Sequence, residues 1–473
     1  LVRFTACPRV GIRYDGGLAR DLPNPGDNDA RWLLVEPPSS PVHAIFRCRI
    51  RIEHRVMSPL LVTESSYQFV PPHRGNLWPR LLNYLVPAYL RRVSGVTEVE
   101  IRGAERVAEL LRGRHGVLLA PNHCRMSDAV VLQCLARRLR QPFFVMASSH
   151  LFRGSRWEAF VLRRLGAFSV YREGVDRQAV QTAIDIVAEA RRPLVLFPEG
   201  ALSQANERLN ALMEGVSLIA RSAAKKMGRQ ESEQKAAKGR SVFVVPVAIR
   251  YLFKGDIEQT AGPLLTRIER RLSWRTREDL PLVQRILRVG PALLALKEME
   301  YLGETQTGEL EQRLERMIDH LLEPLEREWL KEATTDSVIS RVKELRKAVL
   351  PEMIDSGLSA GELARRWRQL EDMELAQQLS LYPAKYVASR PSVDRILETV
   401  ERFMEHLAGE EDPHSPMKAV VEVGEPLAVA AKRDRSVSED PVLSHLERCL
   451  SEMLESLSTE SVLYNPSSGA DSR

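Results

Sequence analysis

Residues 117–132 read VLLAPNHCRMSDAVVL, and this stretch decides the fold class. It opens with residues that are apolar at every position and, after a short polar turn, continues into a helix-like pattern. A run that is apolar throughout predicts a strand covered on both faces, as in a parallel sheet. In open α/β sheets, ligands gather outside the carboxyl ends of the strands, which is where His123 would lie. The stretch therefore predicts such a sheet with a candidate site directly after one strand.

Similar apolar runs recur further along the chain and alternate with helical patterns. The runs are PFFVMA (142–147), AFSVY (167–171), PLVLFPEG (193–200) and SVFVVPVAI (241–249), and helices are expected near 128–140, 157–165, 176–191 and 210–226. The polar stretch 225–240 is expected to form a basic loop. The alternation predicts an α/β fold with a mixed, largely parallel sheet flanked by helices.

The C-terminal half of the chain is predominantly helical in pattern. Apolar residues recur three or four apart in 310–330 and 392–407, whereas MKAVVEVGEPLAV (417–429) is typical of a strand and a turn. A lone strand needs a sheet to join, so we expect an α-helical insertion. The predicted divisions are an N-terminal extension (1–65), an α/β domain with N-terminal interfacial helices (66–264), the helical insertion (265–415), a final strand and helix (416–460) and a tail (461–473).

The N-terminal extension has little recognisable pattern, and only FRCRIRI (46–52) resembles a strand. The sequence begins at Leu1 rather than at a methionine, and the next available start is Met57. A mis-assigned gene start is therefore one hypothesis for residues 1–56.

Composition limits the class of protein. The chain has 473 residues, of which 44% are hydrophobic and 28% charged, with a net charge of +5, which predicts globular domains with full cores. The five cysteines form no C-x-x-C pair, which indicates a reducing compartment and neither a disulfide framework nor a metal site. No apolar run reaches 18 residues and no signal peptide is recognisable, so we expect a soluble or peripheral protein.

Three basic or aromatic segments leave alternatives open. Residues 76–96 combine aromatic rings with arginines and are interrupted by Pro79 and Pro87, which suits a membrane headgroup boundary but equally an ordinary core helix. The basic residues at 137–140 and 225–240 are compatible with nucleic acid or with anionic lipid. We favour a lipid surface and expect no nucleic-acid partner.

His123 and Asp128 carry the first chemical hypothesis. A carboxylate one turn into a helix can fold back onto an imidazole, fix its tautomer and leave the other nitrogen as a base. The alternative is that Asp128 only caps the helix and His123 only makes a loop hydrogen bond. No G-x-S-x-G motif occurs, which favours direct transfer over a covalent acyl-enzyme.

Three later segments, taken in chain order, contain further candidate residues at or near predicted strands. GAFSVYREG places Arg172 after a strand, VLFPEGALS places Glu199, Gly200 and Ser203 after another, and VVPVAI contains Pro246. Together with Asn122, His123 and Asp128, these segments resemble the four blocks of the glycerolipid acyltransferase superfamily, typified by 1-acylglycerol-3-phosphate acyltransferases. The resemblance covers about 75–255 and about 417–457.

The resemblance implies transfer of a fatty acyl group from acyl-coenzyme A or acyl carrier protein to a lysophospholipid or glycerol-phosphate lipid. His123 would be the general base and Asp128 its partner, and no bound cofactor or metal is implied. Asn122, Arg172, Glu199, Gly200, Ser203 and Pro246 would line the substrate site, with Arg172 binding the acceptor's phosphate. The expected location is peripheral, on the cytoplasmic side of a membrane. The alternative is a catalytically degenerate lipid-binding scaffold that works through its helical insertion.

One residue departs from the family pattern. The third block usually continues Thr-Arg-Ser, but here it reads Ala201, Leu202, Ser203. Leucine removes a charge-assisted contact worth roughly 1.5–3 kcal/mol if it was made to a phosphate. This change favours an acceptor with a larger headgroup or another amphipathic alcohol, unless Arg208 or Arg177 supplies the charge. The acceptor, the chain length, the role of the insertion and the oligomeric state are not predicted.

Overall fold

A computed structural model describes residues 67–466, with gaps at 154, 173, 175, 234–238, 332–336, 356–357, 383–384, 409–413, 415 and 434–438. The N-terminal extension, the strand expected at 46–52 and the possible start at Met57 lie outside the described residues, as does the end of the tail from 467 onward.

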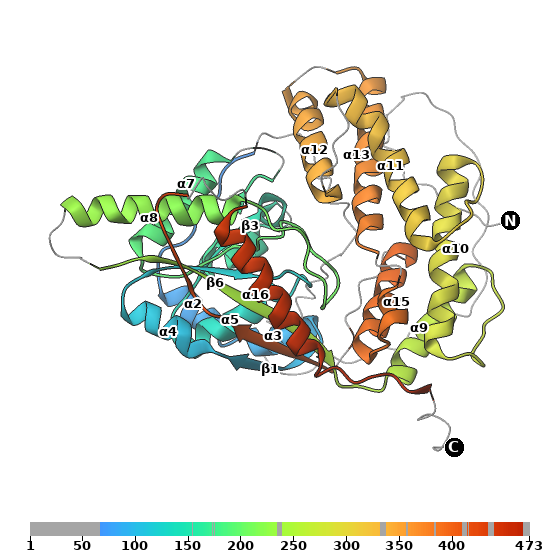
Figure 1. The fold of residues 1–473 in the computed structure, drawn as a ribbon, viewed down its shortest axis with the longest axis horizontal. Helices are drawn as coiled ribbons and strands as arrows, with labels where there is room; N and C mark the ends of the chain where they lie inside the picture. Colours follow the sequence, from blue (N-terminus) through green and yellow to red (C-terminus); the bar gives the residue numbers. More distant parts are fainter. Residues whose placement is uncertain are drawn as a thin grey trace, which may run out of the picture. The chain divides into compact units, whose positions relative to one another are not determined.

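The described chain is a succession of short strands and helices followed by a helical segment and a return to the sheet (Figure 1). The strands are β1 (Val96–Arg102), β2 (Gly116–Pro121), β3 (Phe144–Ser148), β4 (Ala167–Val170), β5 (Leu194–Val195), β6 (Val242–Phe253), β7 (Met417–Val423) and β8 (Leu427–Val429). The helices before β6 are α2 (Leu77–Leu82), α3 (Val86–Val93), α4 (Ala104–Arg112), α5 (Asp128–Leu139), the 3-10 helix η1 (Ser149–Phe152), α6 (Arg156–Arg164), α7 (Arg177–Glu189) and α8 (Gly215–Glu233). The later helices are α9 (Ile257–Arg271), α10 (Leu282–Leu302), α11 (Leu310–Trp329), α12 (Val338–Asp355), α13 (Ala360–Ser380), α14 (Tyr386–Ser389), α15 (Val393–Ala408) and α16 (Pro441–Ser458).

The strands form one mixed sheet in the order β1-β7-β6-β2-β5-β3-β4, with β8 paired to β6. The pairs β1–β7, β2–β6, β2–β5, β3–β5 and β3–β4 are parallel, and β6 is antiparallel to β7 and β8. This arrangement confirms the predicted α/β fold class with a largely parallel sheet. The edge strand β1 was not among the predicted strands.

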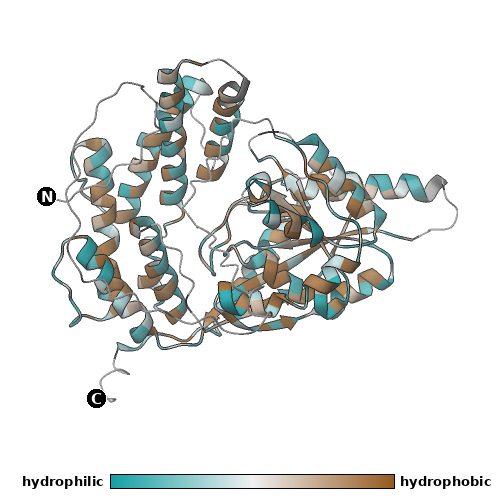
Figure 2. Cartoon of the chain, turned by 180° about the vertical axis from the view of Figure 1, so that it is seen from behind, coloured by the Kyte–Doolittle hydropathy of each residue, from teal (hydrophilic) through white to brown (hydrophobic). Residues whose placement is uncertain are grey.

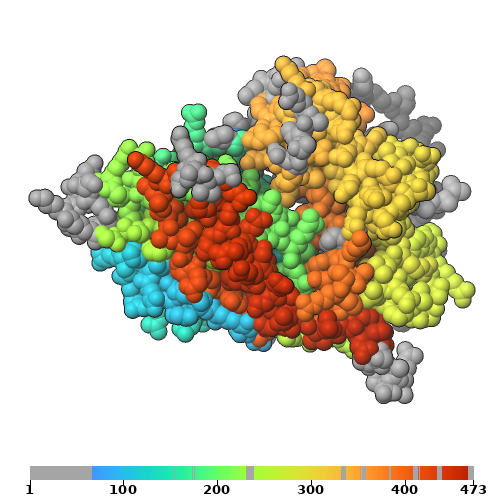
Figure 3. All heavy atoms as spheres, viewed as in Figure 1, coloured from blue at the N-terminus to red at the C-terminus, as the bar shows by residue number. Residues whose placement is uncertain are grey.

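Alternate residues of the central strands pack into different cores. Val117 and Leu119 of β2 join a cluster with α3, α4 and α5, whereas Leu118 and Ala120 join a cluster with α7 and α8. Helix α16 covers the second face beside β6, where its residues pack in front of the strands (Figures 1 and 3). Figure 2 shows the strands as predominantly hydrophobic and the flanking helices as mixed. Strands covered on both faces are apolar throughout because neither face meets water.

The helices between β6 and β7 form two packed groups. Helices α10 to α13 share an apolar cluster, whereas α15 packs beside β6 and against α9, and both belong to the same cluster as α5. Helix α10 contributes to both groups, with Leu294 in the first cluster and Leu282, Ile286 and Val289 in the second. After α15 the chain returns to the sheet as β7, between β1 and β6. The position 264/265, where we divided the chain, lies inside α9. The domain divisions themselves stay a prediction.

One expected loop is partly helical. Helix α8 begins at Gly215 and continues through Glu233, although we expected a helix near 210–226 and a loop from 225. Lysine, glutamine, glutamate and arginine are good helix formers, so the polar composition of 225–233 does not end the helix. Within the described ranges, no helix is both long and apolar enough to span a bilayer.

Candidate active site

His123 and Asp128 meet at the carboxyl end of β2. The strand ends at Pro121, a short turn follows, and α5 begins at Asp128. Nδ1 of His123 lies 2.9 Å from Oδ2 of Asp128. The imidazole is 21% exposed and the carboxylate is completely buried. The pair therefore presents one side of an imidazole to solvent while its carboxylate partner stays in the protein.

The carboxylate of Asp128 accepts further hydrogen bonds on both oxygens. The backbone N–H of Arg125 donates to Oδ2 at 2.9 Å, and the Tyr251 hydroxyl donates to Oδ1 at 2.7 Å. Because both of these partners donate, the carboxylate acts as an acceptor, and the proton of the His123 contact belongs on Nδ1. In the tautomer that donates from Nδ1, Nε2 is the ring nitrogen that can accept a proton. None of these partners is an amide of the first turn of α5, so the side chain does not serve as a helix cap.

Two neighbours hold the imidazole and its strand end. The ring of Phe197, after β5, stacks on the His123 ring with centroids 3.9 Å apart. The Asn122 side chain bridges to β6 because it donates to the Ile249 carbonyl at 3.0 Å and accepts from the Ile249 N–H at 2.7 Å. Asn122 is fully buried. It therefore fixes the strand end, with both its amide oxygen and its amide nitrogen bonded to Ile249.

Glu199 connects the histidine turn to the loop after β5. Its carboxylate is fully buried and accepts from the backbone N–H groups of His123 at 2.7 Å and Asn210 at 2.9 Å. Burial, opposed by these two hydrogen bonds, raises the pKa of Glu199 to about 8. The side chain thereby fixes the main chain on which His123 stands.

Gly200 and Ser203 shape the same loop. Gly200 has a φ of +68°, and a Cβ there would lie 2.2 Å from Sδ of Met213, so a side chain does not fit. The backbone N–H of Ser203 donates to the His123 carbonyl at 2.7 Å, and its buried hydroxyl donates to the Ala205 carbonyl at 3.0 Å. Both residues fix the loop against the histidine turn.

The remaining predicted residues lie further from the imidazole. Pro246 is buried in β6 opposite Ala120 of β2. Arg172 is exposed after β4, which is separated from β2 by β5 and β3. At about 4.8 Å per strand, this separation is roughly 14 Å. Burial and then the charges of Arg172 and Arg153 lower the pKa of the neighbouring His150 to about 4. The structure therefore brings Asn122, Glu199 and Ser203 to the pair, and places Arg172 at another strand end.

Some residues at the site were not predicted. Tyr251 lies on the same face of β6 as Ile249 and Phe253. Because alternate residues of a strand point to the same face, the sequence could have placed Tyr251 on that face. Glu398 and Glu401 lie on α15, where helical spacing places them on one polar face. Neither signal says what these faces contact, because those partners are distant in the sequence.

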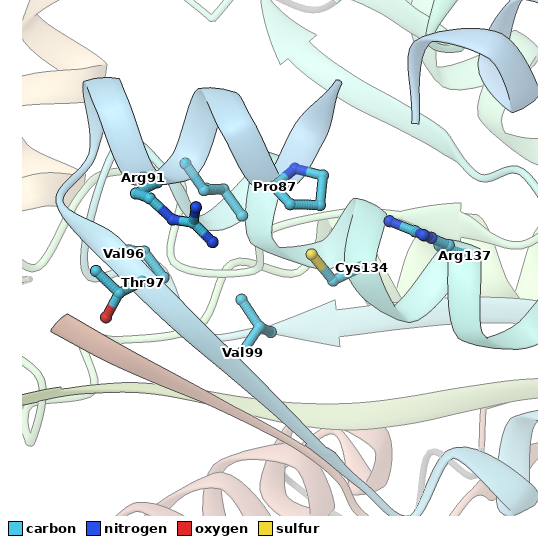
Figure 4. Close-up of a pocket in the computed structure, with 8 residues that line it drawn as sticks. Pro87, Arg91, Val96, Thr97, Val99, Cys134 and Arg137 are labelled. Atoms are coloured by element: carbon cyan, nitrogen blue, oxygen red, sulfur yellow. The ribbon is translucent and has the colours of Figure 1, made fainter. Parts of the chain in front are cut away.

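A cavity of about 230 Å³ lies elsewhere on the α/β fold (Figure 4). It is lined by Pro87, Leu90 and Arg91 of α3, Val96, Thr97 and Val99 of β1, and Cys134 and Arg137 of α5. Helix α5 thus carries Asp128 at its start and part of this cavity further along. In the described part of the chain, no group of three or more His, Cys, Asp or Glu residues is placed to hold a metal ion.

Comparison with known protein families finds a match for the part of the chain that contains most of the sheet. A family model described as Acyltransferase matches residues 98–250, which run from within β1 to within β6 and include every predicted site residue. No curated protein and no solved structure matches the chain.

Proposed function

Because the chain carries an acyltransferase domain of the glycerolipid acyltransferase family, we propose that it transfers a fatty acyl group to the hydroxyl of a lysophospholipid or glycerol-phosphate lipid. The proposed donor is acyl-coenzyme A or acyl carrier protein. The observation that carries the proposal is the 2.9 Å contact between His123 and a fully buried Asp128, with the imidazole still partly exposed at the end of β2.

The proposed reaction is general base catalysis. Nε2 of His123 takes the proton of the acceptor hydroxyl while the hydroxyl oxygen attacks the thioester carbonyl carbon. The C–S bond of the tetrahedral intermediate then breaks, and the imidazolium returns its proton to the leaving thiolate. Asp128 stabilises the imidazolium through Nδ1, and such base catalysis contributes on the order of a hundred- to ten-thousand-fold.

The surroundings of the pair support direct transfer without an acyl-enzyme. Cys124 is buried, and burial raises the pKa of its thiol well above the usual value. The hydroxyl of Ser127 is hydrogen-bonded to that of Tyr251 at 2.9 Å. The hydroxyl of Ser203 is buried and donates to the Ala205 carbonyl. A nucleophile needs an adjacent base and access to substrate, and these side chains lack one or both. The lipid hydroxyl is then the attacking group.

The headgroup of the acceptor is proposed to extend across the carboxyl ends of the strands from β2 to β4. Arg172, three strands away from His123, would contact its phosphate, since a guanidinium offers a fork of donors to such a group. Arg208 lies in the same loop as Glu199 and is half-buried, and burial followed by the charge of Arg402 lowers its pKa. It is the second candidate for an anionic headgroup, in place of the arginine that Leu202 replaces.

A peripheral membrane face is proposed on α2, α3 and α6. Large apolar side chains are exposed there, namely Leu77, Leu81, Tyr84, Leu85, Tyr89 and Trp157. The edge of Trp78 packs on Phe160 with centroids 5.7 Å apart, which joins α2 to α6. Arg137 lies over the exposed Tyr84 ring, so cationic and aromatic groups are interleaved as at a headgroup boundary. We propose that this face attaches the enzyme to the cytoplasmic side of a membrane.

The test is acyl transfer by the purified chain with acyl-coenzyme A or acyl carrier protein. The acceptors are glycerol 3-phosphate, lysophosphatidic acid and lysophospholipids with larger headgroups, and products are identified by mass spectrometry. We expect an acylated product with at least one acceptor, monoacyl from glycerol 3-phosphate or diacyl from a lysolipid, and release of free thiol in equal amount. Absence of product and thiol across the panel would instead support a lipid-binding scaffold.

A further inference from the structure

One polar face of helix α15 contacts the two segments of the candidate site. These segments are the turn from His123 to Asp128 and the loop that follows Glu199. Glu398, Glu401, Arg402 and Glu405 are spaced i, i+3, i+4 and i+7, which places them on the same side of the helix. The opposite side carries the apolar residues Val393, Ile396, Leu397, Val400, Phe403 and Met404, which are buried in the core beside α9 and α10. The helix is therefore fixed on one side and meets the site on the other.

The polar face bonds the loop that follows Glu199. Arg402 donates to the carbonyl oxygens of Ser203 and Gln204. The backbone N–H of Asn206 donates to Glu398 at 3.2 Å, and the Gln204 side chain donates to Glu405 at 3.3 Å. The same loop donates a hydrogen bond from the Ser203 N–H to the His123 carbonyl. A displacement of α15 would therefore also displace the main chain of His123.

Glu401 reaches the turn between His123 and Asp128 directly. Its Oε2 lies 3.0 Å from Nη2 of Arg125, and the two side chains are 18% and 19% exposed. Although burial acts to raise it, the charge of Arg125 and a hydrogen bond from His414 hold the pKa of Glu401 below its usual value. Among the described residues, the titratable groups around the Arg125 guanidinium are Glu398 and Glu401 of α15, Tyr251 of β6 and the adjacent Cys124.

The main chain of Arg125 also binds the carboxylate of Asp128. The Arg125 N–H donates to Oδ2 of Asp128, the oxygen that also contacts His123. The turn is closed by a backbone hydrogen bond from the Asp128 N–H to the Arg125 carbonyl at 3.1 Å, and the Arg125 side chain adds a restraint from α15. Anchoring the side chain of Arg125 therefore fixes the direction in which its N–H points. A displacement of about 1 Å in a reacting group can cost on the order of a hundred-fold in rate.

We propose that α15 is a positioning element of the catalytic site, and that Glu401, acting through Arg125, is a positioning residue for the His123–Asp128 pair. The proposal rests on the proposed acyl transfer. It assigns the segment between β6 and β7 a role in catalysis itself. Glu401 touches no substrate in this account, and its effect appears in kcat rather than in acceptor KM.

The experiment compares Glu401→Gln with a matched control in the full chain. Glu374→Gln breaks the Arg346–Glu374 pair of α12 and α13, whose atoms are 2.7 Å apart and whose side chains are 13% and 10% exposed. We expect Glu401→Gln to lower kcat ten- to hundred-fold with unchanged KM, and Glu374→Gln to change Tm by a similar amount with unchanged kcat. Glu401→Asp keeps the charge and should retain more of the activity.

Two further readouts separate positioning from a general loss of stability. Combining Arg125→Gln with Glu401→Gln should lower kcat no further than the more impaired single variant, because both act through one contact. The acid limb of the pH profile of kcat/KM should move to lower pH in Glu401→Gln, because a displaced carboxylate stabilises the imidazolium less. Wild-type kcat in Glu401→Gln, or additive losses in the double variant, would overturn the proposal. An inactive wild type would overturn the proposed function instead.

Discussion

The Tyr251 hydroxyl donates to Oδ1 of Asp128 at 2.7 Å, and the Ser127 hydroxyl lies 2.9 Å from the same phenol oxygen. This contact joins β6 to the first residue of α5 and occupies the carboxylate oxygen that His123 does not use. Together with the Arg125 amide it fixes the plane of the carboxylate. The general base role that we propose for the pair needs that plane to be fixed before substrate arrives.

Replacing Tyr251 by Phe should therefore lower kcat by roughly five- to a hundred-fold, since an unsatisfied buried acceptor costs about 1–3 kcal/mol. Steady-state kinetics with the acceptor found active would measure it. Tyr382→Phe is the matched control, because the Tyr382 hydroxyl is buried with no hydrogen-bond partner among the described residues. The control should leave kcat and Tm nearly unchanged, and an equal loss in both variants would contradict the role of Tyr251.

Stability should depend on pH through Glu398. Burial, opposed by Arg125 and a hydrogen bond from Tyr386, raises the pKa of Glu398 to about 7 from its usual 4.5. The unfolded chain loses this proton at lower pH than the folded chain, so stability should fall as pH rises from about 4.5 to about 7. Glu398→Gln should make Tm fall less steeply across this window, with Glu199 accounting for part of the remaining slope. An unchanged slope in thermal melts between pH 5 and pH 8 would contradict the assignment.

Gly200→Ala should destabilise the loop that carries Glu199. The residue needs a φ of +68°, and the new Cβ would meet the Met213 sulfur. We expect a loss of about 1–3 kcal/mol in the free energy of unfolding, measured by denaturant titration. Gly361→Ala in α13 is the control, since a Cβ there meets nothing within 4 Å, and it should stabilise the protein by about 0.5–1 kcal/mol. Equal effects in the two variants would show that the Gly200 conformation is not required.

Leu81→Asp should weaken attachment to anionic vesicles. Leu81 is 57% exposed on α2, and Leu296 of α10 has nearly the same exposure, 56%. Flotation with phosphatidylserine-containing vesicles should show a loss of bound protein for Leu81→Asp and none for Leu296→Asp. If both variants and the wild type float equally, the face on α2, α3 and α6 is not the attachment surface. A polynucleotide competitor in the same assay tests whether the basic residues bind nucleic acid.

The apolar runs predicted the central strands because a strand buried on both faces leaves that pattern in the sequence. Strand β1 was missed because it is an edge strand, in which Glu98 and Glu100 alternate with apolar residues. His123 and Asp128 could be proposed because they follow the end of a predicted strand, whereas Asn122 and Glu199 were named because their segments resemble the blocks of the acyltransferase family. Their roles as substrate contacts stay a prediction.

The contacts of Tyr251 and Glu401 could not be predicted in the same way. Tyr251 is 123 positions from Asp128, and Glu401 is 276 positions from Arg125. Which side chains meet depends on the register of β6 against β2 and on how α15 packs beside β6. Neither is set by local pattern, because a shift of one residue along β6 would turn Tyr251 to the opposite face.

The most direct test of the account is acyl transfer by His123→Ala beside the wild type. Both proteins are assayed with the acyl donor and lysolipid acceptor that give product, and both are checked for equal Tm. We expect the wild type to release thiol and form acylated lipid, and His123→Ala to lose at least a hundred-fold in kcat without unfolding. Undiminished transfer by a folded His123→Ala protein would contradict the central claim.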